Sequence, residues 1–183
     1  MDVSLILLVL VVAIGLILVM IYNRLVALKQ TCSQAWGDID VQLKQRHDLV
    51  PNLVETVKGY ASHEKETLEN VIKARQTAVD ASSLKDLAEA ENMLEGALRQ
   101  LFALSEAYPD LKANQNFLSL QNELTDVENK IAAARRFFNN AVQEFNTAIE
   151  QFPAVLIAGT FGFSVRDYFE VGEAERGAPK VKF

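Results

Sequence analysis

The two histidines of this 183-residue chain are candidate metal ligands or catalytic bases. His63-Glu64 matches the start of His-Glu-x-x-His, in which two histidines one helical turn apart bind zinc. The second histidine would stand at position 67, where the sequence has Thr67. The only other histidine, His47, would lie about 160° around a continuous helix from His63, at about 100° per residue. The sequence therefore predicts no metal site, and we interpret both histidines as surface or capping residues.

The search for a nucleophile is also negative. Cys32 has no nearby histidine to activate its thiol, so we interpret it as a small apolar residue of a helix. Gly159 and Gly162 lie near Ser164 without the Gly-x-Ser-x-Gly spacing of a nucleophile elbow. There is no phosphate-binding loop and no dinucleotide fingerprint. The sequence predicts no enzyme and no cofactor.

Composition excludes further classes of protein. The chain has 18 Lys and Arg against 24 Asp and Glu, a net charge of −6, which argues against nucleic acid as a partner. Half of the residues are hydrophobic, with only 8 Gly and 4 Pro, which excludes a disordered or collagen-like chain. A single cysteine excludes an internal disulfide.

The first 23 residues differ from the rest. From Val3 to Tyr22 the chain is apolar except for Ser4 and Gly15. At about 1.5 Å per residue a helix of this length spans roughly 30 Å, the thickness of the hydrocarbon core of a bilayer. A cleaved signal peptide needs a basic start and small residues at the cleavage site. Here Asp2 is the only early charged side chain and the run ends in bulky residues, so we predict an uncleaved anchor.

The flanking residues predict how this anchor is oriented. Tyr22 stands where aromatic residues favour the membrane–water interface. Arg24 and Lys29 follow the apolar run, and no Lys or Arg precedes it. The positive-inside rule then predicts a single-pass protein with its N-terminus outside and most of the chain in the cytoplasm.

The chain after the anchor shows the three-to-four-residue spacing of apolar side chains that is typical of helices. The first such stripe runs from Leu25 to Ile72 and lapses near Arg46–His47 and at Glu64. Two interpretations are open. One is a single helix kinked at Pro51, with Gly59 as a second weak point. The other is two helices broken near Asp48–Pro51, with Asp48 as the cap of the second.

Two further helices are predicted. A break near Asp80–Ser83, with Ser82 or Ser83 as the cap, precedes a helix that stops at Tyr108-Pro109. A heptad-like stripe then runs from about Leu111 to Phe152, and Pro153 ends it. No strand-like alternation appears. The sequence predicts an all-α fold, an N-terminal transmembrane helix followed by a bundle of long antiparallel helices. Periodicity alone does not decide whether the long stripe serves an internal core or a partner chain.

The end of the chain has two parts. Residues 152–165 are mostly apolar but too few to span a membrane. They either pack on the bundle or form an interfacial or partner-binding patch. Residues 171–183 have the composition of a disordered tail. The predicted organisation is thus an anchor at 1–23, a helical bundle domain at 24–170 and a tail at 171–183.

Several long motifs carry a resemblance to a known family. They are Tyr22–Lys29 directly after the anchor, Trp36–Val54, Val57–Leu68, Ala74-Arg75, Glu106–Phe117, Leu120–Leu124 and Glu128–Asn139. Together they closely resemble the LemA family of bacterial membrane proteins, over roughly residues 4–170. Small departures exist, such as Phe138 where a tyrosine is common in the family.

The resemblance implies an N-terminal membrane anchor, a long-helix domain and no established enzymatic activity. It supplies no catalytic residues, but it marks positions that match the family motifs as a candidate structural or interaction surface. These are Trp36, Arg46, Asp48, Pro51, Asn52, Tyr60, His63, Tyr108, Asp110, Arg135 and Asn139. We expect a non-enzymatic anchored protein that self-associates and scaffolds membrane or partner proteins. The alternative is a monomeric adaptor for a membrane protease or signalling complex. The expected partners are the lipid bilayer, further copies of the chain and other membrane proteins.

Overall fold

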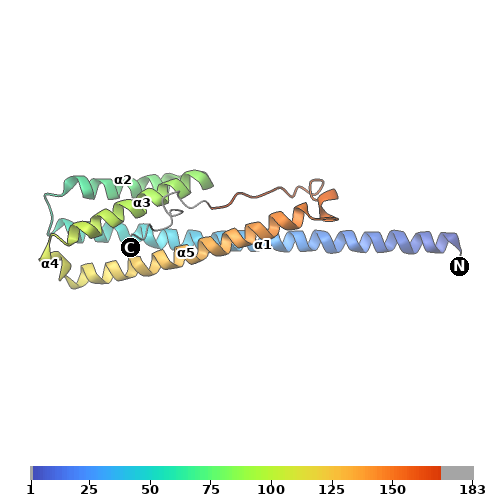
Figure 1. Cartoon of the computed structure of the whole chain (residues 1–183), viewed down its shortest axis with the longest axis horizontal. Helices are drawn as coiled ribbons and strands as arrows, with labels where there is room; N and C mark the ends of the chain where they lie inside the picture. Colours follow the sequence, from blue (N-terminus) through green and yellow to red (C-terminus); the bar gives the residue numbers. More distant parts are fainter. Residues whose placement is uncertain (1, 170–183) are drawn as a thin grey trace, which may run out of the picture. The chain divides into compact units, whose positions relative to one another are not determined.

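The computed structural model describes residues 2–169 and confirms the all-α prediction, because this part of the chain contains helices and no strand. The elements are α1 (Val3–Lys58), α2 (Lys65–Asp80), α3 (Leu84–Ser105), α4 (Pro109–Lys112), α5 (Gln115–Glu150) and a 3-10 turn (Ala154–Leu156). Figure 1 colours these helices along the sequence, from blue at the N-terminus to red near the C-terminus. The predicted disordered tail, 171–183, lies outside the described residues.

The helix α1 ends at Lys58, which neither interpretation of the sequence predicted. The helix α1 runs without interruption through Pro51, so the break predicted near Asp48–Pro51 is wrong. The continuation to Ile72 is also wrong, because the chain leaves the helix after Lys58 and α2 begins at Lys65. Gly59, the residue after the helix, loses more conformational freedom in a helix than any other residue type, which favours termination there.

A side chain from α2 explains how α1 passes through a proline. Pro51 has no N–H, so the carbonyl of His47, four residues earlier, loses its helical donor. The Nε of Arg75 donates a hydrogen bond to this carbonyl at 2.7 Å. An unpaired carbonyl in a partly buried position costs about 1–3 kcal/mol, so Arg75 removes much of the penalty of the proline.

Helix caps set two of the other boundaries. Ser83 accepts a hydrogen bond at 3.1 Å from the backbone N–H of Asp86, which confirms the break predicted near Asp80–Ser83. The side chain of Asn114 accepts at 3.0 Å from the N–H of Phe117 in the same way. The cap at Asn114, after the short helix α4, explains why α5 begins four residues later than the sequence predicted.

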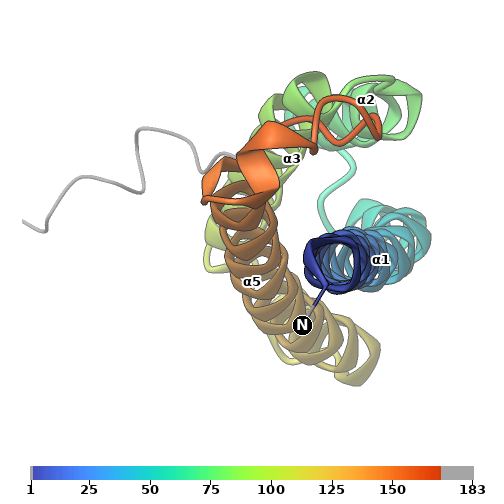
Figure 2. The same ribbon diagram turned by 90° about the vertical axis from the view of Figure 1, so that its right-hand side faces the viewer.

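The described chain divides into two compact units, to which both α1 and α5 contribute. The bundle unit consists of residues 39–135 with Phe169, and the anchor unit of residues 2–38 and 136–168. In the bundle unit the end of α1, then α2, α3 and the start of α5 run alternately up and down, as Figures 1 and 2 show. Their shared interior is apolar, with fully buried side chains from every helix, among them Leu53, Val71, Leu94, Leu111 and Phe117.

The heptad-like stripe of α5 is an internal core. Phe117, Leu124 and Ile131 are buried inside the bundle unit, and Phe138 and Phe145 are buried inside the anchor unit. In the anchor unit Trp36 of α1 meets Phe138 edge to face, with the ring centroids 5.5 Å apart. The stripe is therefore used within this chain.

The start of α1 has the opposite character. The residues from Val3 to Met20 are exposed. They are also strongly apolar, because an 18-residue window of this helix has a mean hydropathy of 3.3 and is 0% buried. A helix of a soluble core would bury such a surface. Length, hydropathy and exposure together indicate a membrane anchor.

Candidate functional site

A buried charge network lies in the middle of the bundle unit. Arg46 of α1 is 0% exposed, because it occupies the apolar stripe between Leu43 and Val50. Its Nη2 donates to the equally buried Glu91 of α3, and its Nη1 donates to Glu128 of α5 at 2.6 Å. One guanidinium therefore joins three helices, with its two terminal nitrogens on separate carboxylates.

A histidine is the second hydrogen-bond partner of Glu91. The Nε2 of His47 lies 2.8 Å from the second carboxylate oxygen of Glu91. Since an ionised carboxylate only accepts hydrogen bonds, Nε2 must carry the hydrogen. The backbone carbonyl of His47 is the group held by Arg75, so α2 is tied to the same turn of α1. The four long helices α1, α2, α3 and α5 are therefore joined at this point.

The electrostatics keep Glu91 ionised. Burial alone would raise the pKa of its carboxyl. The hydrogen bond from His47 and the charge of Arg46 outweigh burial and hold the pKa of Glu91 below its usual range. A buried carboxylate held in this way stabilises the fold only while its partners remain in place.

Arg135 is a second buried cation, on α5. Burial, followed by the charge of Arg46, lowers the pKa of Arg135, while Glu128 and Glu91 act in the opposite direction. An arginine nevertheless keeps its proton at neutral pH. Its guanidinium lies 4.6 Å from the centroid of the Phe169 ring, a cation–π contact, and its Nε and Nη2 have no hydrogen-bond partner in the structure.

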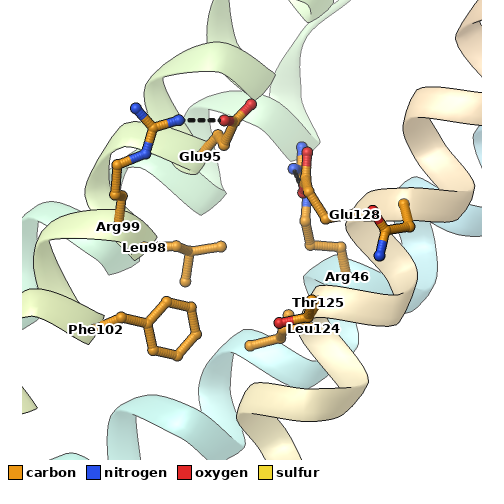
Figure 3. Close-up of a pocket in the computed structure, with 9 residues that line it drawn as sticks. Arg46, Glu95, Leu98, Arg99, Phe102, Leu124, Thr125 and Glu128 are labelled. Atoms are coloured by element: carbon orange, nitrogen blue, oxygen red, sulfur yellow. Dashed lines mark hydrogen bonds and ion pairs between the residues drawn. The ribbon is translucent and has the colours of Figure 1, made fainter.

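A cavity of about 260 Å³ opens beside the network. Figure 3 shows Leu98 and Phe102 of α3 facing Leu124 of α5, with Arg46 and Glu128 at one end. The full lining is Arg46, Glu95, Leu98, Arg99, Phe102, Leu124, Thr125, Glu128 and Asn129. Most of the surface area that lines the cavity is apolar, and the charged groups of the lining already bond to one another. It contains no Ser, Cys or His beside a base in the arrangement that nucleophilic catalysis needs.

The structure brings only two of the predicted site residues to this network, Arg46 and Arg135. Two others lie where α1 and α3 end. Tyr108 donates its hydroxyl hydrogen to Glu64 at 2.9 Å, which raises the pKa of Tyr108, and Tyr60 accepts from Asn114 at 2.8 Å.

The remaining predicted residues are spread over both units. Asp48 is exposed and pairs with Lys44 one turn away at 2.6 Å, and this pairing lowers the pKa of Asp48. On the bundle unit Pro51, Asn52, His63 and Asp110 are exposed, and on the anchor unit Trp36 and Asn139 are half-buried.

Sequence reasoning missed the acidic half of the network and its histidine. Glu91 lies three residues after Ala88 and three before Leu94, at a core position of α3. A charged residue at a core position of the stripe was the available signal. His47 was interpreted as a surface or capping residue, but it is half-buried and bonded to Glu91. Among the described residues no group of three His, Cys, Asp or Glu is placed to hold a metal ion.

Comparisons with known proteins find a family and several named relatives. The model of the LemA family matches residues 35–183. The magnetosome protein MamQ of Magnetospirillum gryphiswaldense is 25% identical over 178 residues, covering 83% of this chain and 65% of that protein. The protein LemA of Metamycoplasma hominis is 28% identical over 158 residues, covering 84% and 71%. The magnetosome protein MamQ 2 of Paramagnetospirillum magneticum is 24% identical over 179 residues, covering 84% and 66%. The chain thus spans only about two thirds of the length of these relatives.

Proposed function

The chain belongs to the LemA family, and from that premise we propose that it is a non-enzymatic, membrane-anchored helical protein that self-associates and scaffolds membrane or partner proteins. One observation carries this proposal. A single uninterrupted helix, α1, supplies both the exposed apolar run of residues 3–20 and core residues of the bundle unit. A helix shared in this way is suited to presenting a folded module at a membrane.

The way in which the charged groups are used supports a non-enzymatic role. Arg46 bonds to both Glu91 and Glu128, and the guanidinium of Arg135 lies over the ring of Phe169. Buried charges that pair with one another hold helices in register, whereas a catalytic group must be available to a substrate.

Self-association is proposed to run through the anchor. The stripe of α5 is used inside the chain, so it offers nothing to a second copy. The exposed apolar face of α1 is the large surface left, and helices in a bilayer associate through close side-chain packing. The proposed location is the bacterial inner membrane, with the bundle in the cytoplasm.

A monomeric adaptor is the alternative, and the same use of the α5 stripe favours it. Its partner would be another membrane protein, such as a protease or a signalling complex. The two proposals differ in subunit number, which one measurement resolves.

That measurement is the mass of the full-length protein in mild detergent, by light scattering corrected for bound detergent. A uniform particle of several times the 20.4 kDa chain mass at all concentrations supports the scaffold. A single-chain mass refutes self-association and supports the adaptor. A fragment lacking residues 1–23 is the matched comparison. If it stays monomeric while the full chain assembles, the anchor is the assembly element.

A further inference from the structure

We propose that the apolar segment after α5 is a second membrane contact, which lies in the lipid–water interface of the bilayer beside the anchor. The segment is residues 152–163, here called the aromatic loop. This inference rests on the membrane anchoring proposed above and adds where, beyond the anchor, the chain meets lipid.

The first step is the register between the aromatic loop and α1. Tyr22 ends the exposed apolar run of the anchor. The ring of Phe161 lies 5.2 Å from the ring of Tyr22 and that of Phe163 lies 5.8 Å from it, both edge to face. Phe161 also joins Leu18, Val19 and Tyr22 around a shallow hollow. These contacts hold the loop at the level where the apolar span of the anchor ends, which is the level of the interface.

The second step is that the loop is held in place while its outer face stays apolar. Its inner side chains Ala154, Ala158 and Phe163 are buried. The chain beyond it is fixed by the Asn146 side chain, which donates to the carbonyl of Arg166 and accepts from its N–H, both at 2.9 Å. The exposed side chains of the loop are therefore presented by a packed inner layer.

The outer face is unusually apolar for a surface in water. Phe152 is 79% exposed and Leu156 is 70% exposed, and Val155 and Phe161 are each 51% exposed. Single exposed apolar residues are ordinary, but a group of four on one short segment marks a site of association. The residues from Phe152 to Ser164 include no charged side chain.

The third step identifies lipid as the occupant. Phe161 of the loop lines one hollow together with Leu18, Val19 and Tyr22 of the exposed anchor surface, so a bilayer that covers the anchor reaches the loop as well. Basic groups also lie beside the loop. The ammonium of Lys29 lies 5.9 Å from the centroid of the Phe163 ring, and Arg24 lines a hollow together with Gln151, the residue before the loop. Apolar residues edged by cations fit an interface that contains anionic phospholipids.

The test uses the full chain reconstituted in phosphatidylcholine–phosphatidylglycerol vesicles, with single tryptophans quenched by lipids brominated either near the headgroup or deep in the acyl chain. Trp36→Phe removes the native tryptophan and keeps an aromatic ring against Phe138. In that background Leu156→Trp reports the loop, and Val155→Trp is a second reporter in case the first perturbs folding. Leu10→Trp reports the anchor. Ile72→Trp, 52% exposed on α2, is the matched control on the bundle unit.

The expected result is that shallow bromines quench the loop reporters, deep bromines quench Leu10→Trp, and neither quenches Ile72→Trp. If Leu10→Trp is quenched while both loop reporters behave like Ile72→Trp, the loop lies outside the membrane and the inference is overturned, although the anchor stands. If the loop reporters are unquenched but blue-shifted, protein covers the loop, which also overturns the inference. If Leu10→Trp is unquenched, the anchoring itself fails.

Discussion

Replacing Arg46 by methionine tests whether the buried charge network stabilises the bundle unit. The substitution keeps an unbranched side chain of similar length in a site that is 0% exposed, and it removes the arginine that bonds to both Glu91 and Glu128. Glu91 is then a buried carboxylate with only His47 as its partner. Removing one partner of a buried ion pair typically costs about 3–5 kcal/mol.

This cost is large against the stability of a domain. Native domains are stable by only about 5–15 kcal/mol, so the variant should lie near the limit of folding. With roughly 2–4 °C of melting temperature lost per kcal/mol for a chain of this size, the midpoint should fall by roughly 6–20 °C. The assay is urea and thermal unfolding of the full chain in mild detergent at pH 7, followed by far-UV ellipticity.

A matched control lies on the same helix as Glu91. Arg99 also bonds to a glutamate, Glu95, at 2.7 Å, but its side chain is 76% exposed. An exposed pair of this kind contributes about 0–1 kcal/mol, so Arg99→Met should change the midpoint little. A loss for Arg46→Met no larger than that for Arg99→Met would refute the reasoning, because burial would then not govern the cost.

The double variant Arg46→Met with Glu91→Leu separates loss of a pair from loss of packing. With both charges gone, no unpaired ion remains at the two fully buried positions, and Glu128, whose side chain is 35% exposed, can turn to water. Apolar replacement of a whole buried pair is often neutral or stabilising. The double variant should therefore be more stable than either single variant, and additive losses would contradict this account.

Three further predictions follow from single contacts and are measured by the same unfolding assay. Pro51→Ala restores the helical N–H and should raise the free energy of unfolding by about 1–3 kcal/mol. The gain should be larger in an Arg75→Met background, because the carbonyl of His47 then has no other donor. Equal gains in the two backgrounds would show that Arg75 does not replace the missing donor. Ser83→Ala should lower the free energy of unfolding by about 1 kcal/mol, because it removes the cap of α3. Ser82→Ala should leave the free energy of unfolding unchanged, and equal losses for the two variants would contradict the cap assignment. Because the folded pKa of Glu91 is depressed, its contribution is present at neutral pH and is lost as the pH falls below about 4.3 and through the folded pKa. Glu91→Gln should therefore show a shallower loss of stability between pH 5 and 3, and an unchanged slope would exclude Glu91 as the titrating group.

Local rules predicted most of the fold. The caps and proline signals placed the break before α3 and the end of α3 near Tyr108-Pro109. They failed at Pro51, because the compensating donor, Arg75, lies 24 residues further along the chain, on another helix. No local pattern announces such a donor. The true break between α1 and α2 was visible only as a lapse of the stripe at Glu64 and as Gly59.

The candidate site was predicted only in part. Lys44 and Asp48 stand four residues apart, the spacing of an ion pair along one helix, and they do pair, but at the surface. The contacts that matter in the interior join Arg46 to Glu91 and Glu128, 45 and 82 residues away. Partners so distant in sequence are set by how the helices pack, and periodicity within one helix does not determine that.

The charged residues that interrupt the apolar stripes also carry information about the interior. Arg46 lies three residues after Leu43 and four before Val50, and Glu91 and Arg135 hold equivalent places among buried residues. When apolar positions on both sides keep their register, the helix continues and the intervening charged side chain must point inward. A buried charge without a partner is too costly to retain, so two cations and one carboxylate at core positions require another acid nearby. Glu128, next to Val127 on the inner side of α5, meets that requirement. The interruption of the apolar stripes of α1 and α3 by a charge therefore predicts a buried ion pair, and Arg46 and Glu91 form it.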